Sequence, residues 1–310
     1  MSRLIFIPQF PTPLRYSEFF FTEIPNELSK HYDEVIVLGK GVAPRDGVEY
    51  PKGLFSPIDT ACHVEAAQIR EYMAGVKLRG DDTLLHMDLS FPGIFHNVLY
   101  LKRPKKCFCY CHATSLNTGD IFEKDRVSKW LTELGNSKLY DKVFVATKYH
   151  ADKLELDNTV IVGLPIPPWP TFKEEKIYDI ISVARPTPQK VDFELEEIVS
   201  KKFGPIVRKE CKTWEEYYKF LSSAKIVLFT GIEETFGYPV MEAILNSSIP
   251  LCPNRCSYSE LLDDSYLYHN TKDLLELIDN YLSNYNLVPE LKCMDLCKNF
   301  YKNICEIIKK

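Results

Sequence analysis

The stretch KIVLFTGIEETFGYPVMEA, Lys225 to Ala243, contains a strand, a loop and a helix in the order that builds an α/β fold. It starts with a short apolar run, which predicts a buried strand ending near Gly231. Pro239 suits the start of a helix, because proline lacks the amide hydrogen that would go unused there and its φ is already helical. Two carboxylates, Glu234 and Glu242, stand eight positions apart around this helix start. The stretch therefore predicts a strand–loop–helix unit with polar groups at the carboxyl end of the strand.

Apolar runs of strand length alternate with helical patterns on both sides of this unit, which predicts an α/β fold with parallel, doubly wound sheets. The segment PIPPWPTFKEEK, Pro165 to Lys176, is rich in proline and cannot continue a helix or a central strand. We predict that it links an N-terminal domain, residues 1–164, to a C-terminal domain, residues 177–290. Residues 291–310 are predicted to form a helix that packs back on the N-terminal domain. Two Rossmann-like domains of this kind face each other across a cleft, where the strands end and ligands bind.

Composition limits the function classes. Hydrophobic residues make up 45% and charged residues 26% of the 310 residues, which is typical of a soluble globular protein. The start of the chain, MSRLIFIPQFPTP, has too short an apolar run for a signal peptide, and no run approaches membrane-spanning length. We expect a cytoplasmic protein without membrane insertion. The net charge of −5 gives no overall attraction to nucleic acid, although a local basic patch could still bind it. The cationic cluster KRPKK, residues 102–106, is expected to be a solvated loop at the end of the sheet away from the cleft.

The chain has ten cysteines, which we expect to be free thiols. Cys107, Cys109 and Cys111 alternate in KCFCYCHAT, so they point to one face of a strand and suit a buried core. A metal site that adds His112 is the alternative, but the spacing matches no zinc motif. We therefore predict no metal site.

The loop that holds Glu234 suits a ligand with phosphates and hydroxyls. Gly237 allows the backbone to approach a ligand closely, and the free N–H groups of the following helix favour an anion. Glu234 and Glu242 are placed to accept hydrogen bonds from hydroxyl groups. A nucleotide sugar has both kinds of group. The alternative is a helix-capping loop with two solvated acids.

A second pair of polar residues follows another predicted strand, in IISVARPTPQK, residues 180–190. Arg185 offers a planar fork and Lys190 a point charge for phosphate oxygens. Together they could neutralise a departing diphosphate. Taken singly, each could equally be a solvated loop cation.

These residues carry a resemblance to the retaining GT-B glycosyltransferases. Arg185 and Lys190 match the R-x₄-K pair of that family, and Glu234 to Glu242 matches its E-x₇-E element with phenylalanine, glycine and proline inside. The resemblance implies a hexosyl- or pentosyltransferase that takes its sugar from a nucleoside-diphosphate sugar and needs no metal or other cofactor. The short distance from Arg185 to Glu234 implies a reduced C-terminal sheet.

The resemblance also implies roles for single residues. Arg185 and Lys190 would hold the donor diphosphate, and Glu234 the hydroxyls of the transferred sugar. Phe236, Gly237 and Tyr238 belong to the same donor-binding group, and Glu242 would hold the ribose hydroxyls. His112 would contact the sugar or the acceptor from the N-terminal domain. Weaker candidates at strand ends of that domain are His86 and Asp88. The base-binding loop is expected near residues 208–213, and the N-terminal loop PQFPTPLRY, residues 8–16, lacks the glycine pair that many members use near the donor phosphates.

The acceptor is open at this stage. The segment IPLCPNRCSYSELLDDSYLYHNT, residues 249–271, is similar to the tRNA-queuosine mannosyltransferase branch, and short GT-B enzymes of phages glycosylate hydroxymethylated DNA bases. A modified nucleic-acid base is therefore one candidate acceptor; a glycan, a lipid or a small molecule is the alternative. A non-catalytic protein that binds a sugar nucleotide is a further alternative. Within this segment, Ser257 and Glu260 predict a capping box at a helix start.

Overall fold

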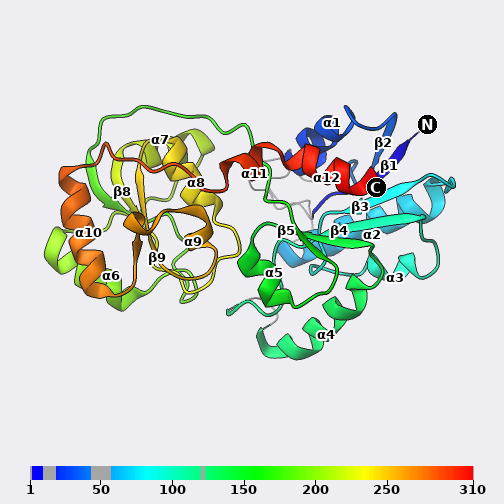
Figure 1. Ribbon diagram of the computed structural model, residues 1–310, viewed down its shortest axis with the longest axis horizontal. Coiled ribbons are helices and arrows are strands. Elements are labelled where there is room, and N and C mark those ends of the chain that lie inside the picture. Colours follow the sequence, from blue (N-terminus) through cyan, green and yellow to red (C-terminus); the bar gives the residue numbers. More distant parts are fainter. Residues whose placement is uncertain (1, 10–18, 43–56, 120–122, 310) are drawn as a thin grey trace.

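The computed structural model describes residues 2–9, 19–42, 57–119 and 123–309. Most of the N-terminal loop at residues 8–16, which lacks the glycine pair, lies outside these ranges. The described residues form two α/β units, each built on a parallel sheet (Figure 1). Among the described helices, none combines the length and the apolar character needed to cross a membrane.

The N-terminal sheet has the strand order β2-β1-β3-β4-β5-β6, with every pair parallel. Its strands are β1 (Arg3–Ile7), β2 (Glu34–Val37), β3 (Thr83–His86), β4 (Lys106–Tyr110), β5 (Lys142–Val145) and β6 (Thr159–Ile161). Its helical segments are η1 (Phe19–Glu23), α1 (Ile24–Leu28), α2 (Pro57–Gly75), α3 (His96–Leu99), η2 (Glu123–Asp125), α4 (Arg126–Ser137) and α5 (Lys148–Leu154). The strands are almost entirely buried in the middle of the sheet, because helices cover both faces of a parallel sheet.

The C-terminal sheet has four strands in the order β10-β9-β8-β7, which confirms the predicted reduced sheet. Its strands are β7 (Tyr178–Ile181), β8 (Ala224–Leu228), β9 (Ile249–Pro253) and β10 (Leu267–Tyr268). Its helical segments are α6 (Phe193–Phe203), α7 (Trp214–Ser222), α8 (Tyr238–Leu245), α9 (Tyr258–Leu261), η3 (Asp264–Tyr266) and α10 (Thr271–Ser283). The predicted strand–loop–helix unit is β8, its loop and α8.

The reduced sheet keeps a trace of one more strand. Val207 forms a single parallel bridge with Ile181 on the free side of β7. With that bridge counted as the second strand, the order in the C-terminal sheet is 2-1-3-4-5, and the N-terminal sheet has the same order with a sixth strand added at the end. This order reverses direction between the first and third strands, and such a switch point leaves a crevice at the carboxyl ends of the strands. In the C-terminal sheet the crevice therefore lies beyond β7 and β8.

The chain crosses between the two units twice. Residues 162–177, after β6, contain no helix or strand. After α10, the chain returns through α11 (Met294–Lys298) to α12 (Phe300–Lys309), which lies beside α1 (Figure 1). The Lys106 ammonium donates to the Ile308 carbonyl at 2.9 Å, and the ring of Phe300 packs near that of Tyr110. The last helix is thus part of the covering of the N-terminal sheet.

The ten cysteines are free thiols, as predicted. Cys107, Cys109 and Cys111 are fully buried in one side of the N-terminal core. Burial raises the pKa of the Cys109 and Cys111 thiols well above their usual value, so they stay protonated. Within the described ranges, no group of three or more His, Cys, Asp and Glu side chains is arranged to hold a metal ion.

Candidate functional site

A cavity of about 1090 Å³ lies in the crevice beyond β7 and β8. It is lined by residues that follow the two strands, by the loop before α7 and α7 itself, by residues around the start of α8, and by Tyr258 at the start of α9. The lining residues include Ser182, Arg185, Lys190, Arg208, Trp214, Tyr217, Phe229, Glu234, Pro239 and Tyr258. All of the lining residues belong to the C-terminal unit, and the loop expected to bind the base, residues 208–213, is among them. A cavity of this size and position can hold a nucleotide-sized ligand.

Lys190 and Glu234 meet on the wall of this cavity. The Lys190 ammonium donates to a carboxylate oxygen of Glu234 at 3.1 Å and to the Glu233 carbonyl at 2.8 Å. The two side chains are 26% and 18% exposed, so the ion pair is partly shielded from water. The other carboxylate oxygen of Glu234 accepts from the amide of Thr235 at 3.1 Å. A cation for an anionic ligand and an acceptor for hydroxyl groups therefore lie side by side.

Arg185 lines the same cavity with an exposed side chain. Its guanidinium forms no hydrogen bond or ion pair with any residue that the structure describes, and only its carbonyl is engaged, by the amide of Thr187. All five of its N–H groups are thus free to bind an anion. The structure therefore brings Arg185, Lys190 and Glu234 together, as predicted from their places after two neighbouring strands.

Arg208 contributes a further cation that is already paired. Its guanidinium forms an ion pair with Glu196 and donates to the Ser182 hydroxyl at 3.2 Å. Glu196 lies on α6, and its carboxylate is also bound by the Thr230 hydroxyl. This network ties the loop at residues 208–213 to β7 and to the segment after β8, so it holds the shape of the cavity.

Glu242, which is expected to hold the ribose hydroxyls, does not itself line the cavity. It sits in the second turn of α8 and is fully buried. Its carboxylate accepts from the Tyr217 hydroxyl at 2.8 Å, and Tyr217 is the residue that lines the cavity. The helix turns Glu242 towards α7 because the positions around it, such as Met241 and Ala243, fill the core. A ligand in the cavity as it stands would meet Tyr217 before Glu242.

Residues 236–238 also lie behind the cavity wall. The Phe236 ring is buried, and the Tyr238 ring packs against Trp169 while its hydroxyl donates to the Pro165 carbonyl at 2.7 Å. Tyr238 therefore binds the connecting segment between the two sheets. Gly237 has a φ of +100°, and a Cβ there would lie 3.0 Å from Leu261. The glycine is thus required by the turn into α8.

His112 lies after β4, outside the cavity lining. Its ring packs against Tyr110 at a centroid distance of 4.4 Å and edge-on against Phe20. Burial lowers the pKa of His112 to about 3, so the imidazole is neutral. Its carbonyl accepts from the Thr235 hydroxyl at 3.1 Å, which brings this strand end against the loop that carries Glu234.

Comparison with known proteins gives this geometry a context. No family model matches the sequence. A curated protein of Drosophila melanogaster named tRNA-queuosine alpha-mannosyltransferase is 30% identical over 93 residues, which are 30% of this chain and 25% of that protein. The match thus spans about a quarter of the length of the fly protein.

Solved structures are similar over a longer range. HepE of Anabaena, in complex with UDP and glucose, superposes with a TM-score of 0.63 at 10% identity and full coverage of both chains. TarM of S. aureus, in a complex that includes UDP, gives a TM-score of 0.52 at 17% identity over 79% of this chain and 55% of that one. The chain has the GT-B fold. At these sequence identities the similarity concerns the fold alone. The similar fold agrees with the two parallel sheets described above.

His86, one of the two weaker candidates, belongs to a buried cluster in the N-terminal half of this GT-B fold. Its Nδ1 lies 2.9 Å from the Tyr140 hydroxyl, which is also 2.7 Å from Nδ1 of His96. The Leu89 carbonyl accepts from Nε2 of His96, so the proton of this neutral imidazole is on Nε2. Nδ1 of His96 therefore accepts from the Tyr140 hydroxyl. The oxygen of that hydroxyl in turn accepts from Nδ1 of His86. Burial lowers the pKa of both imidazoles, so they are neutral. The cluster is part of the buried core of the N-terminal unit.

Asp88, the other weaker candidate, makes the stability of this GT-B chain depend on pH. Burial raises its pKa to about 7, although the amides of Ser90 and Phe91 donate to it. Between pH 3.8, the pKa of Asp88 in the unfolded chain, and pH 7, the folded state binds the Asp88 proton more tightly than the unfolded state does. The tighter binding of this proton stabilises the fold at low pH, and that stabilisation is lost as the pH rises towards 7. We expect Asp88→Asn to remove that loss, since the amide oxygen can still accept from both N–H groups.

Urea unfolding at pH 5 and pH 8 checks this expectation. The unfolding free energy of Asp88→Asn, relative to that of wild type, should be higher at pH 8 than at pH 5. A gap that stays constant between the two pH values would show that Asp88 does not titrate in this range.

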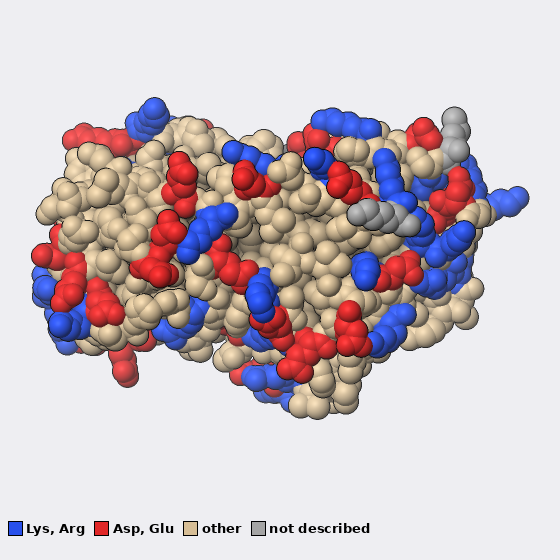
Figure 2. All heavy atoms as spheres, in the orientation of Figure 1, with Lys and Arg blue, Asp and Glu red and all other residues tan. Residues whose placement is uncertain are grey.

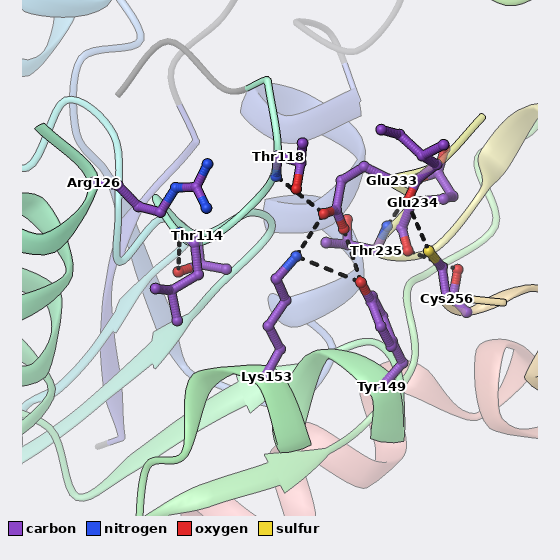
Figure 3. A network of polar contacts seen from close by, with 12 residues as sticks. Thr114, Thr118, Arg126, Tyr149, Lys153, Glu233, Glu234, Thr235 and Cys256 are labelled. Carbon is purple, nitrogen blue, oxygen red and sulfur yellow. Dashed lines mark hydrogen bonds and ion pairs between the residues drawn. The ribbon is translucent and has the colours of Figure 1, made fainter. Parts of the chain in front are cut away.

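Sequence reasoning missed the residues that hold the loop at residues 233–235 from the N-terminal side. Glu233 is buried, and its carboxylate is bound by Lys153, Tyr149 and Thr118 (Figure 3). Lys153 and Glu233 are 80 positions apart, so no local pattern links them. The only signal in the sequence is that two glutamates are adjacent: Glu234 is assigned to the ligand, and Glu233 has no assigned role.

Proposed function

We propose that the protein is a retaining glycosyltransferase that moves a sugar from a nucleoside-diphosphate sugar to an acceptor hydroxyl. The observation that carries this proposal is the cavity at the switch point, where Arg185, Lys190 and Glu234 converge. Two cations suit the diphosphate, and the carboxylate suits sugar hydroxyls. The HepE and TarM structures, which have UDP bound, support a nucleotide donor. Retention rests on the match of these residues to the R-x₄-K and E-x₇-E pattern.

The chain's own residues act mainly on the leaving group. When the bond between the anomeric carbon and the diphosphate breaks, its electron pair stays on the phosphate oxygen. Arg185 and Lys190 stabilise that charge without having to reorganise, and the first turn of α8, which contains Pro239, adds its positive dipole end. The proposal needs no metal ion or other cofactor, because these groups supply the positive charge.

The acceptor hydroxyl attacks from the face that the leaving group departs from, which retains the configuration. Its oxygen forms the new bond to the anomeric carbon, and its proton passes to the departing phosphate oxygen. Glu234 accepts hydrogen bonds from the sugar and holds it in place, while its pairing with Lys190 keeps it beside the diphosphate. Arg185 and Lys190 act on the reacting groups, and Glu234 acts on the sugar. His112 lies after β4 on the other side of the loop, where it would border the acceptor.

We propose a hydroxyl on a modified nucleic-acid base as the first acceptor to test. The fly relative is named for a queuosine in tRNA, and its match is the specific observation in favour of this class. Hydroxymethylpyrimidine DNA belongs to the same class. A glycan, a lipid or a small molecule is the competing acceptor class.

The cationic cluster at residues 102–106 does not support a nucleic-acid surface. Arg103 and Lys105 are exposed, as expected of a solvated loop, while Lys102 and Lys106 are half-buried. Lys102 donates to the Tyr72 carbonyl at 2.8 Å, Arg103 to that of Leu139, and Lys106 to that of Ile308. On the face shown in Figure 2, Lys and Arg side chains are interspersed with Asp and Glu. Nucleic-acid recognition would therefore rest on the base and its immediate surroundings.

Replacing Arg185 by alanine tests the donor site without disturbing the fold. Because the guanidinium has no partner among the described residues, we expect an unchanged melting temperature and an affinity for UDP about tenfold weaker, as befits one lost charge-assisted contact. Isothermal titration calorimetry with UDP measures this. Arg79→Ala removes an exposed arginine that pairs with Glu34 and is the matched control.

A panel of nucleoside-diphosphate sugars in a thermal-shift assay would then identify the donor, since a ligand of the folded state raises the melting temperature. Incubation of that donor with queuosine tRNA, hydroxymethylated DNA and simple glycans follows. A transferase releases nucleoside diphosphate with one of them. A non-catalytic binder, the alternative function, shifts the melting temperature and releases none. If no nucleotide sugar shifts a well-folded sample, the proposal is wrong.

A further inference from the structure

The N-terminal unit grips the loop at residues 233–235 through one buried carboxylate. The Glu233 carboxylate accepts from the Lys153 ammonium at 2.6 Å, the Tyr149 hydroxyl at 3.0 Å and the Thr118 amide at 3.0 Å (Figure 3). The side chains of Lys153 and Glu233 are only 17% and 8% exposed. We call these four residues the Glu233 clamp. Three donors from the N-terminal unit thus converge on a single side chain of the C-terminal unit.

The same residue faces the candidate donor site with its backbone. The Glu233 carbonyl accepts from the Lys190 ammonium at 2.8 Å, and the next residue, Glu234, supplies the other partner of Lys190. The Ile232 amide donates to the Gln189 carbonyl at 3.0 Å, which ties the two loops together a second time. The position of the Lys190 ammonium therefore depends on where residues 232–234 are held.

Further contacts dock the start of α5 beside this clamp. The Glu260 carboxylate accepts from the amides of Lys148 and Tyr149, both at 2.7 Å. The capping box predicted for Ser257 and Glu260 is thus absent, because Glu260 reaches across to the N-terminal unit. Ser257 donates instead to the carbonyls of Glu234 and Phe236, at 3.2 and 3.1 Å. The helix that carries Tyr149 and Lys153 is therefore fixed against the C-terminal unit at its first turn.

We propose that Lys153, Tyr149 and the Thr118 amide are positioning groups for Lys190. By holding Glu233 they fix the loop whose carbonyl holds the Lys190 ammonium, and the N-terminal unit thereby sets the strength of anion binding in a cavity that it does not line. That this anion is the diphosphate of a sugar donor rests on the proposed function. The mechanical link from Glu233 to Lys190 rests on the contacts alone.

Hydrogen exchange tests the link without any ligand. In Glu233→Gln and in Lys153→Gln, we expect faster exchange in residues 116–119, which include the Thr118 amide, and also in residues 187–191 and 230–235. Lys148→Gln is the matched control, because it lies on the same helix and its side chain forms an exposed ion pair with Asp152. Faster exchange that is confined to residues 116–119 and 230–235 would overturn the proposal, since a purely structural interface would relax only its own two sides and leave residues 187–191 unchanged.

Calorimetry with UDP supplies the second readout. We expect each single variant to bind UDP roughly three- to thirtyfold more weakly, the range for residues that act through others, while Lys148→Gln binds as wild type. The double variant Glu233→Gln/Lys153→Gln should bind no more weakly than either single variant, because both remove the same link. Additive losses, or unchanged affinity in the single variants, would overturn the proposal.

The two readouts separate the two proposals. If wild type binds no UDP and no nucleotide sugar, the proposed function fails, and the exchange pattern still decides on the clamp. If wild type binds UDP and exchange at residues 187–191 is unchanged in both single variants, the clamp fails and the proposed function stands. Lys153→Gln keeps the test open should Glu233→Gln fold poorly.

Discussion

Replacing Lys190 by methionine is expected to lower the turnover of the proposed sugar transfer by about 100- to 1000-fold, the usual cost of one preorganised group that stabilises transition-state charge. The Lys190 ammonium is held in the cavity by the Glu233 carbonyl and the Glu234 carboxylate. Methionine has a similar length and no charge, so the wall of the cavity keeps its shape. The measurement is the rate of nucleoside-diphosphate release at saturating donor and acceptor.

Two further variants make this result specific. Lys190→Arg keeps the charge and should retain more activity than Lys190→Met, although the planar guanidinium fits a point-charge position imperfectly. Lys201→Met removes an exposed lysine that pairs with Glu197 and should leave turnover unchanged. Full turnover in Lys190→Met would contradict the role given to the leaving-group cation.

Replacing Arg3 by methionine is expected to lower the free energy of unfolding by about 3 kcal/mol, as when one partner of a buried ion pair is removed. Arg3 binds Asp82 with two parallel hydrogen bonds of 2.7 and 2.6 Å, and it also donates to the Lys77 carbonyl. The two side chains are 6% and 0% exposed. Without Arg3, the Asp82 carboxylate stays buried with only the Arg79 amide to bind it.

The effect should depend on pH in a defined direction. Burial opposes ionisation of Asp82, yet the hydrogen bonds from Arg3 and the Arg79 amide outweigh it and hold its pKa below the usual value. The stabilisation is therefore present above about pH 4, the unfolded pKa, and is lost as the pH falls through the folded pKa. Urea unfolding at pH 7 and pH 3 measures this. Lys138→Met, which breaks the exposed pair with Asp157, should change the unfolding free energy by less than about 1 kcal/mol. An equally small loss in Arg3→Met would contradict the expectation.

The fold was predictable because its signals are local. The apolar run at β8 and Pro239 in the first turn of α8 mark their elements within a few residues. Alternation of such units predicts parallel sheets, and the short spacing from Arg185 to Glu234 predicts the reduced one. Because the carboxyl ends of β7 and β8 are neighbours, the meeting of Arg185, Lys190 and Glu234 also follows from the order of elements.

The side-chain directions within the site could not be predicted in the same way. Glu242 and Tyr238 lie on α8, and its rotation is set by which residues fill the core against α7 and the connecting segment. Their partners, Tyr217 and Pro165, are 25 and 73 positions away. The Glu233 clamp depends on how the two units dock, and no local pattern of residues in the sequence predicts that docking.

The placement of α12 bears on the order in which the protein is made. Its residues cover the N-terminal sheet, with Phe300 against Tyr110 and the Ile308 carbonyl bound by Lys106. A ribosome delivers residues in sequence, and domains generally fold as they emerge, with the N-terminal one first. Here the part of the first unit that α12 covers stays exposed until the whole second unit has been translated. We expect a chaperone to bind the apolar surface that is exposed during that interval.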